Sequence, residues 1–278
     1  MYLKTAKKNI IALAVIIFLT AFVNKQPGKP VLYIIGDSTV KNGTGKGMDA
    51  LWGWGSVIGS YFDTSEIEVR NHAIGGRSSR TFITEGRWDD ILKTLKAGDY
   101  IIMQFGHNDS SPLDDTARAR GTIKGIGNES REIYNPVRKV KETVYTYGWY
   151  MRKYVNDAKE KGAIPVICSP VPRNNFKDGK VQRADKDYGL WAKEVAAQTG
   201  AFFVDLNGLV ADDYDKLGAD AVSSFFPKDH THTNLEGARL NAAKVVEGIK
   251  RLDSCDLKSY LNPPEPVQLG VADGVAKK

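Results

Sequence analysis

The sequence predicts an α/β protein, a three-layer α/β/α sandwich around a five-stranded parallel sheet. Short apolar runs rich in β-branched and aromatic residues recur along the chain, and each is followed by a stretch long enough to hold a helix. Such alternation is typical of a parallel sheet covered by helices on both faces. The 278 residues, 42% hydrophobic and 26% charged, allow one domain with a sizeable core.

Five apolar segments are the predicted strands. The first follows a short Lys/Gly/Pro linker and stops at Gly36. The strands are expected at Val31–Ile35, Ile67–Val69, Tyr100–Phe105, Ile164–Cys168 and Phe202–Val204.

The segments between the strands supply the predicted helices, the last of which follows the candidate N-caps Thr233 and Asn234. The polar, Gly-containing stretch Ser110–Pro136 shows no sustained periodicity and directly follows a predicted strand, so we expect a surface loop at that strand end. With these crossovers the five strands predict a flavodoxin-like topology. Helices are expected at Trp54–Phe62, Trp88–Leu95, Val137–Lys161, Tyr188–Gln198 and Leu235–Leu252.

The two ends of the chain are expected to lie outside the folded domain, which we place at residues 30–262. Residues 1–24 combine three lysines with the apolar run Ile10–Val23, the layout of an export signal, although the run is short for a membrane span. No small-x-small cleavage site stands out, so a removed signal peptide and a retained N-terminal anchor both stay open. We expect a periplasmic or extracellular protein, with membrane contact only if the segment is retained. Residues 263–278, which are rich in Pro and Lys, should form a C-terminal tail.

The charge balance argues against a nucleic-acid partner. The formal net charge of +6 becomes +3 without residues 1–24, and no basic run stands apart from neighbouring acids.

Cys168 and Cys255 have no metal-site spacing, so we expect buried free thiols, although export would permit a disulfide. We also expect a monomer.

Polar residues follow the predicted strand ends, where doubly wound sheets bind their ligands. Gly36-Asp37-Ser38-Thr39 follows the first strand, Gly75-Gly76-Arg77-Ser78 the second and Gly106-His107-Asn108-Asp109 the third, and Asp229-His230-Thr231-His232 precedes the last helix.

These residue types are the ones that serine ester hydrolysis needs. A serine hydroxyl must give its proton to a base, usually a histidine held by a carboxylate, and Ser38, His232 and Asp229 fit those roles. The oxyanion of the acyl intermediate needs donors, which the backbone N–H groups of Ser38 and Gly76 and the side-chain amide of Asn108 offer.

Each element also has a simpler explanation. Gly-Asp-Ser and Gly-Gly are common turn sequences, Asn108 could cap a helix, and Asp229 with His232 could be a surface pair or two ligands of a metal site. The coincidence favours catalysis, because the elements fall at consecutive strand ends in the order that one triad with one oxyanion hole requires.

At this point the sequence resembles the GDSL or SGNH hydrolases, a family whose four blocks supply Ser, Gly, Asn and His. Gly36-Asp37-Ser38 resembles the first block, with Thr39 in place of the family's Leu. Gly76, Asn108 and the pair Asp229 and His232 match the other three. The longer strings around these residues, from Leu32 to Leu252, look like rhamnogalacturonan acetylesterases.

The resemblance implies the SGNH hydrolase fold and a secreted serine carbohydrate esterase of pectin degradation that needs no metal or cofactor. Its partner would be an acetylated plant cell-wall polysaccharide or oligosaccharide. Ser38 would attack the acetyl group, with His232 as base and Asp229 as its partner. Rhamnogalacturonan is the favoured backbone, and acetylxylan or another polysaccharide is the alternative.

Two other functions stay open from the sequence. A lipase or thioesterase with the same triad would need an apolar acyl channel, and the polar loop Ser110–Pro136 argues against one. A carbohydrate-binding module that has lost catalysis would not need the complete set of catalytic residues. For substrate contacts we expect contributions from Arg77, His107 and Trp54, since sugars bind to aromatic faces and planar polar groups, and an arginine would suit a uronic acid.

Overall fold

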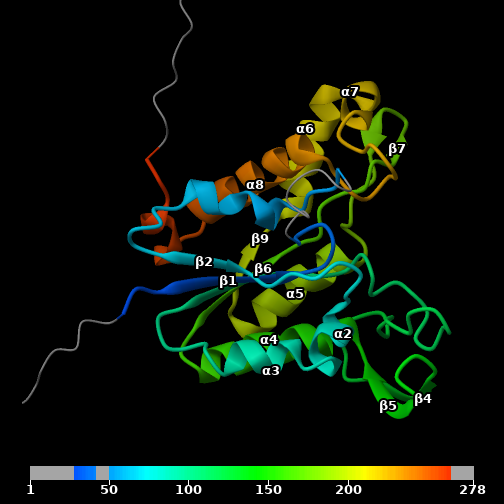
Figure 1. Ribbon diagram of the computed structural model, residues 1–278. Coiled ribbons are helices and arrows are strands. Elements are labelled where there is room, and N and C mark those ends of the chain that lie inside the picture. Colours follow the sequence, from blue (N-terminus) through cyan, green and yellow to red (C-terminus); the bar gives the residue numbers. More distant parts are fainter. Residues whose placement is uncertain (1–27, 42–49, 264–278) are drawn as a thin grey trace, which may run out of the picture.

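The protein folds around one five-stranded parallel sheet, seen in a computed structural model that describes residues 28–41 and 50–263 (Figure 1). The strand order is β2-β1-β3-β6-β9, which is 2-1-3-4-5 when the five strands are counted along the chain. This is the flavodoxin-like order, so the predicted fold class is confirmed. The strands are β1 (Val31–Gly36), β2 (Glu68–Asn71), β3 (Tyr100–Gln104), β6 (Ile164–Cys168) and β9 (Phe202–Val204).

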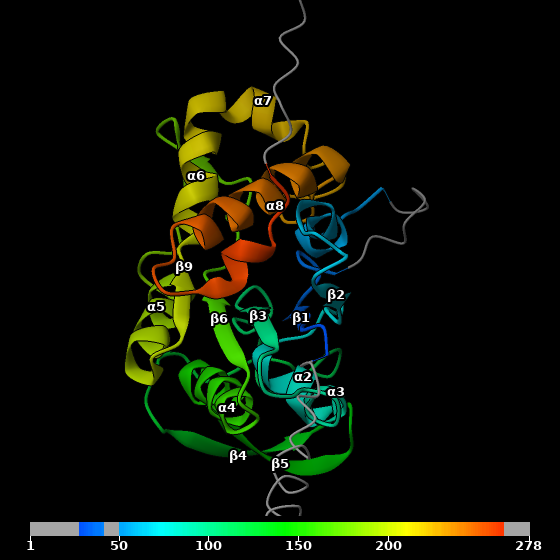
Figure 2. The same ribbon diagram turned by 90° about the vertical axis from the view of Figure 1, so that its left-hand side faces the viewer.

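Helices cover both faces of the sheet, as Figures 1 and 2 show. Successive strand residues point to opposite faces, so Ile34 and Ile102 join one apolar cluster while Ile35 and Met103 join the other. The first face packs against η1 (Trp54–Ser56), η2 (Ile58–Tyr61), α6 (Leu206–Leu217), α8 (Leu235–Lys250) and η3 (Asp256–Tyr260), and α7 (Ala219–Ser223) extends this layer. The second face packs against α2 (Ser79–Thr84), α3 (Arg87–Leu92), α4 (Tyr147–Glu160) and α5 (Tyr188–Thr199).

One predicted helix is wrong over its first part. The segment expected as Val137–Lys161 begins with strand β5 (Val140–Tyr145), which pairs antiparallel with β4 (Ser130–Asn135), and only then forms α4. Val144 is fully buried between two partly or fully exposed neighbours, which is the period of two of a strand. The side chain of Thr146 then accepts a hydrogen bond from the backbone N–H of Trp149 and caps α4.

Other differences from the prediction concern short elements. The expected helix Trp54–Phe62 is two short 3₁₀ helices, and the expected loop Ser110–Pro136 contains β4. Helices α2 and α6 and the small hairpin of β7 (Phe176–Lys177) and β8 (Lys180–Val181) were not predicted. The short helix α2 is held by its capping box, which joins Ser78 to Thr81.

The predicted N-terminal signal or anchor, residues 1–24, and nearly all of the predicted tail, residues 263–278, lie outside the described residues. Within residues 28–41 and 50–263, no helix has the length and apolar character needed to cross a bilayer. Cys168 and Cys255 are both buried free thiols, which confirms the expectation from the sequence.

A buried ion pair fastens α2 to the β4–β5 hairpin. Nε of Arg80 lies 2.8 Å from Oε1 of Glu142, and the arginine side chain is completely buried. Its Nη1 also donates to the carbonyl oxygens of Leu113 and Gly121, at 2.9 and 2.8 Å. Arg80 therefore holds the loop after β3 against α2 as well as against the hairpin.

A buried carboxylate joins the end of β3 to the start of α2. Asp109 is almost fully buried and accepts hydrogen bonds from the backbone N–H and the hydroxyl of Ser79. Burial raises the pKa of Asp109 to about 7, against the opposing effect of the Ser79 hydrogen bonds and with a further upward contribution from the charge of Asp37.

This pKa predicts how stability depends on pH. The pKa of an aspartate in an unfolded chain is about 4, so the folded state binds the proton of Asp109 more tightly than the unfolded state does. The contribution of Asp109 to the free energy of unfolding is therefore fully present below about pH 4 and is lost as the pH rises through about 7. Urea unfolding across this range should show that wild type loses stability relative to Asp109→Asn, while the exposed control Asp114→Asn follows wild type. Parallel curves for wild type and Asp109→Asn would contradict this.

Candidate active site

Ser38 lies on a tight turn directly after β1. The carboxylate of Asp37 accepts hydrogen bonds from the backbone N–H and the hydroxyl of Thr39, both at 2.8 Å. The backbone carbonyl of Asp37 accepts a hydrogen bond from the backbone N–H of Lys41. A Cβ on Gly36 would lie 2.7 Å from the carbonyl oxygen of Gln104, so only glycine allows this approach. The turn leaves Ser38 partly exposed at the edge of the sheet.

The Asp229–His232 turn brings the second part of the site to Ser38. Oδ1 of Asp229 accepts the backbone N–H groups of Thr231 and His232, at 2.7 and 2.8 Å, which folds the turn around the carboxylate. Asn234 then caps α8 through the N–H of Gly237. One aspartate thus shapes the loop and keeps its other oxygen for the imidazole.

The three side chains form one hydrogen-bonded chain. Oγ of Ser38 lies 2.8 Å from Nε2 of His232, and Nδ1 of His232 lies 2.7 Å from Oδ2 of Asp229. With the proton of the neutral imidazole on Nδ1, Nε2 accepts from the serine hydroxyl, which is the arrangement that activates a serine. His230, an exposed histidine in the same segment, has no hydrogen bond to Ser38.

The charge of Asp229 suits this role. Partial burial raises its pKa, but hydrogen bonds from the imidazole and backbone of His232 and from Thr231 outweigh that effect and lower the pKa to about 2. The carboxylate is therefore ionised at neutral pH, where it can stabilise an imidazolium.

Gly76 and Asn108 lie in the same pocket as Ser38. Gly76 has a φ of +79°, a conformation that favours glycine, in the turn before α2. Nδ2 of Asn108 donates to the carbonyl of Arg77 at 2.8 Å, which orients the amide and leaves its second hydrogen. Within the described residues, the backbone N–H groups of Ser38 and Gly76 donate to no acceptor. These donors are therefore available to an oxyanion.

The pocket around Ser38 has a volume of about 630 Å³, and most of the described residues that line it have polar or charged side chains. Apart from glycine, Ala117 and Val137 are the apolar residues among those that line it, and Val137 comes from the turn of the β4–β5 hairpin. The other lining residues are Ser38, Gly75, Gly76, Arg77, Thr81, Glu85, His107, Asn108, Arg118, Arg120, Arg173, Thr231 and His232.

His107 lines the pocket with both ring nitrogens engaged. Nδ1 lies 3.3 Å from Oδ2 of Asp37, and Nε2 lies 2.9 Å from the carbonyl oxygen of Val171. Burial raises the pKa of Asp37, but the nearby imidazole and the hydrogen bonds from Thr39 hold that pKa below its ordinary value. His107 thus braces the turn that carries Ser38, with its ring nitrogens facing Asp37 and Val171.

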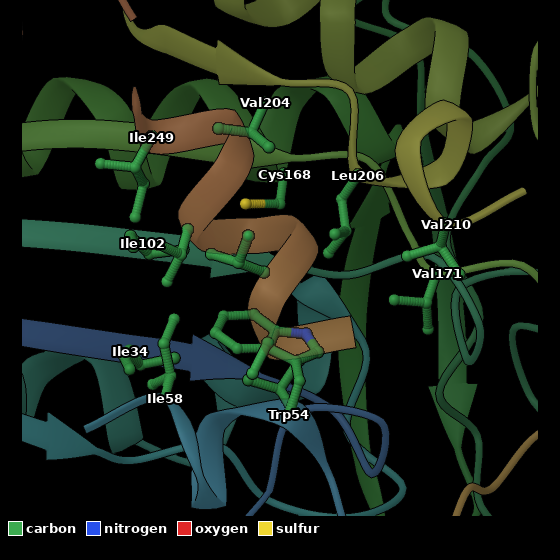
Figure 3. Packing of buried hydrophobic residues seen from close by; sticks show 14 of the residues in the cluster. Ile34, Trp54, Ile58, Ile102, Cys168, Val171, Val204, Leu206, Val210 and Ile249 are labelled. Carbon is green, nitrogen blue, oxygen red and sulfur yellow. The ribbon is translucent and has the colours of Figure 1, made fainter. Parts of the chain in front are cut away.

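Two of the expected substrate contacts are placed differently by the fold. Trp54 is completely buried and its Nε1 donates to Oε1 of Gln104 at 2.9 Å, so the prediction that it contacts substrate is wrong. Figure 3 shows its ring inside the apolar cluster with Ile34 and Ile58. Arg77 does line the pocket, but its guanidinium is bound to Glu85 at 3.0 Å and to the carbonyl of Gly75 at 3.0 Å.

Three further arginines line the pocket that sequence reasoning did not single out: Arg118, Arg120 and Arg173. The sequence could have indicated them only by their position after a strand. Arg118 and Arg120 follow β3, and Arg173 follows β6, at the edge of the sheet where Ser38 lies.

Comparisons with known proteins agree with this geometry. The model of the GDSL-like lipase/acylhydrolase family matches residues 34–240. A rhamnogalacturonan acetylesterase from Emericella nidulans is 36% identical over 219 residues, which are 78% of this chain and 84% of that protein. A rhamnogalacturonan acetylesterase from Bacillus subtilis, RhgT, is 30% identical over 84% of this chain and 95% of its own length.

A solved structure extends the likeness to the fold. The crystal structure of the Bacillus subtilis protein YxiM superimposes with a TM-score of 0.65 at 26% identity, covering 80% of this chain and 56% of that one. The sequence match spans most of the chain and includes the segments that carry Ser38 and His232. The protein therefore belongs to the GDSL-like lipase/acylhydrolase family.

Proposed function

We propose that this protein is a serine carbohydrate esterase that removes O-acetyl groups from a pectic polysaccharide, rhamnogalacturonan, through an acyl-enzyme. The observation that carries the proposal is the hydrogen-bonded chain of Ser38, His232 and Asp229, which lies beside backbone N–H groups that have no acceptor among the described residues. The two relatives named as rhamnogalacturonan acetylesterases support the choice of backbone.

The geometry supports a two-step reaction. Oγ of Ser38 attacks the acetyl carbonyl carbon while Nε2 of His232 takes the hydroxyl proton, and the oxyanion is held by the N–H groups of Ser38 and Gly76 and by the Asn108 amide. Collapse breaks the bond to the sugar oxygen, which receives the proton from His232. Water then attacks the acetyl-serine with His232 again as base, and acetate and free Ser38 are released. Asp229 stabilises the imidazolium in both steps.

The pocket lining favours a small acyl group over a lipid chain. A long acyl chain needs an apolar channel, whereas this pocket is lined by charged and polar side chains apart from Ala117, Val137 and glycines. The basic and apolar N-terminus supports export to the periplasm or the extracellular space, where the enzyme would encounter plant polysaccharide. N-terminal sequencing of the exported protein would distinguish a cleaved signal from an anchor.

Loss of the nucleophile or base should abolish acetate release. We expect Ser38→Ala to be inactive on acetylated rhamnogalacturonan and His232→Ala to lose roughly 10⁴-fold or more in kcat. The matched control is His230→Ala, an exposed histidine two residues away without a bond to Ser38, which should keep wild-type rates. Full activity in either triad variant, with melting temperatures near wild type, would refute the proposal.

The oxyanion donor should act on turnover more than on binding. Asn108→Ala removes one amide donor, so we expect kcat to fall about 10²- to 10³-fold while KM changes little. Steady-state kinetics with acetylated oligosaccharides measure both constants. A kcat equal to that of wild type would exclude Asn108 from the oxyanion hole.

Acyl-chain length separates an acetylesterase from a lipase or thioesterase. Because the described residues that line the pocket form no apolar channel, kcat/KM for 4-nitrophenyl esters should fall about 10-fold or more between acetate and octanoate. Equal or faster hydrolysis of the octanoate would favour a lipid substrate. Acetate release from rhamnogalacturonan, homogalacturonan and xylan, measured side by side, then identifies the backbone.

A further inference from the structure

The candidate active-site pocket carries an excess of positive charge. Among the described residues, four arginines line it and Glu85 is the one acidic residue of the lining. The whole chain has a formal charge of only +6, so this concentration belongs to the pocket and is not a general surface property. The four arginines differ in what already binds them.

Two of the four arginines are committed to other groups. Arg77 is paired with Glu85, as described above. Arg173 donates to the hydroxyl of Thr231 and to the carbonyl of His107, and the charges of Asp37 and Asp229 act on it. Both therefore serve the framework of the triad.

The other two arginines have neutral partners or none. Arg120 donates from Nε to Oγ of Ser111 at 3.0 Å and from Nη1 to the carbonyl of Gly76 at 3.2 Å. The exposed guanidinium of Arg118 has no hydrogen-bond partner among residues 28–41 and 50–263. Within the same residues, neither arginine forms an ion pair with a carboxylate.

Both guanidinium groups converge on the oxyanion side of the pocket. The Nη1 atoms of Arg120 and Arg118 lie 3.5 and 4.0 Å from the point that a Cβ on Gly76 would occupy. Burial lowers the pKa of Arg120, and the neighbouring charge of Arg118 lowers it further, against the opposing charges of Asp115, Asp37 and Asp109. Two like charges held together without a counter-ion favour an anionic ligand.

Among the described acids, Asp115 has the largest opposing effect on the pKa of Arg120, but it forms no ion pair with either arginine. Asp115 directs its carboxylate oxygens to the backbone N–H groups of Ala117, Arg118 and Ala119, at 2.8 to 3.0 Å. Asp37 and Asp109 are buried and hydrogen-bonded within the turns after β1 and β3.

The loop that carries the two arginines is fixed before any substrate arrives. The buried Arg80 binds the carbonyls of Leu113 and Gly121 on either side of it, and Gly121 N–H donates to Pro112 at 3.0 Å. Because the backbone of this loop is already held, a carboxylate that binds to the two guanidinium groups has to order side chains and no further backbone.

We propose that Arg118 and Arg120 form an anion subsite that binds the carboxylate of the uronic acid residue whose acetyl ester Ser38 attacks. The proposal rests on the esterase function above and assigns its substrate selectivity to two residues. A uronic acid carries its carboxylate on the same ring as the acetylated hydroxyl, so one pocket can hold both groups. Neutral acetylated sugars lack the group that these arginines bind.

The test compares one substrate with and without its charge. Acetylated rhamnogalacturonan oligosaccharides and the methyl esters of their uronic acid carboxyl groups are hydrolysed in parallel, and the ratio of their kcat/KM values is measured by acetate release. Wild type should prefer the free acid, and Arg118→Gln should lower that preference about 10-fold, mainly through a higher KM for the acid. The double variant with Arg120→Gln should lower it about 100-fold, and Arg118→Lys should recover part of it.

Lys124→Gln is the matched control, because it removes one positive charge from the same loop at an exposed position outside the pocket lining. It should leave the preference at the wild-type value. Equal wild-type rates on acid and methyl ester, or equal losses on both in Arg118→Gln, would overturn the anion subsite and leave the esterase intact. Absence of acetate release from both forms by wild type would overturn the esterase and the subsite together.

Discussion

The parallel pairing of β1 with β3 is the constraint on which the rest of this structure depends. Gly36 lies opposite Gln104, so the two strands end at the same edge and deliver Ser38 and Asn108 to one pocket. A shift of one residue in this register would exchange the two apolar faces and turn the polar turns away from each other. The glycine is part of the constraint, because a side chain there would collide with the neighbouring strand.

Around that edge, environment gives the carboxylates different tasks. Asp229, partly open to solvent and surrounded by donors, has its pKa lowered to about 2 and faces the imidazole as an anion. Asp109, almost fully buried, has its pKa raised to about 7 and ties the end of β3 to α2. Asp37 braces His107 beneath the nucleophile. The same residue type thus supplies charge in one place and framework in two others, according to burial and hydrogen bonding.

The catalytic set and the surrounding loops contribute separately to function. The triad and its oxyanion donors are suited to many esters. The loop after β3 adds Arg118 and Arg120 to the pocket lining, and the β4–β5 hairpin adds Val137. The buried Arg80–Glu142 pair joins those two segments to α2. Because it keeps the basic loop next to Gly76, a structural ion pair supports the substrate selectivity that we assign to Arg118 and Arg120.

The sequence by itself determined the parts of this protein that depend on local pattern. The five strands were predictable from apolar runs that end in glycine or polar turns, and Ser38, Asn108, Asp229 and His232 from their positions in short segments at those ends. Tertiary structure decided what depends on contacts between distant segments. Strand β5 (Val140–Tyr145) forms because it pairs with β4, and Trp54 is buried because α8 and the sheet enclose it. Arg118 lies beside Arg120 near Gly76 because Arg80 fixes their loop. A loop's own residues do not encode where it will be held, so its arginines acquire their role only in the folded chain.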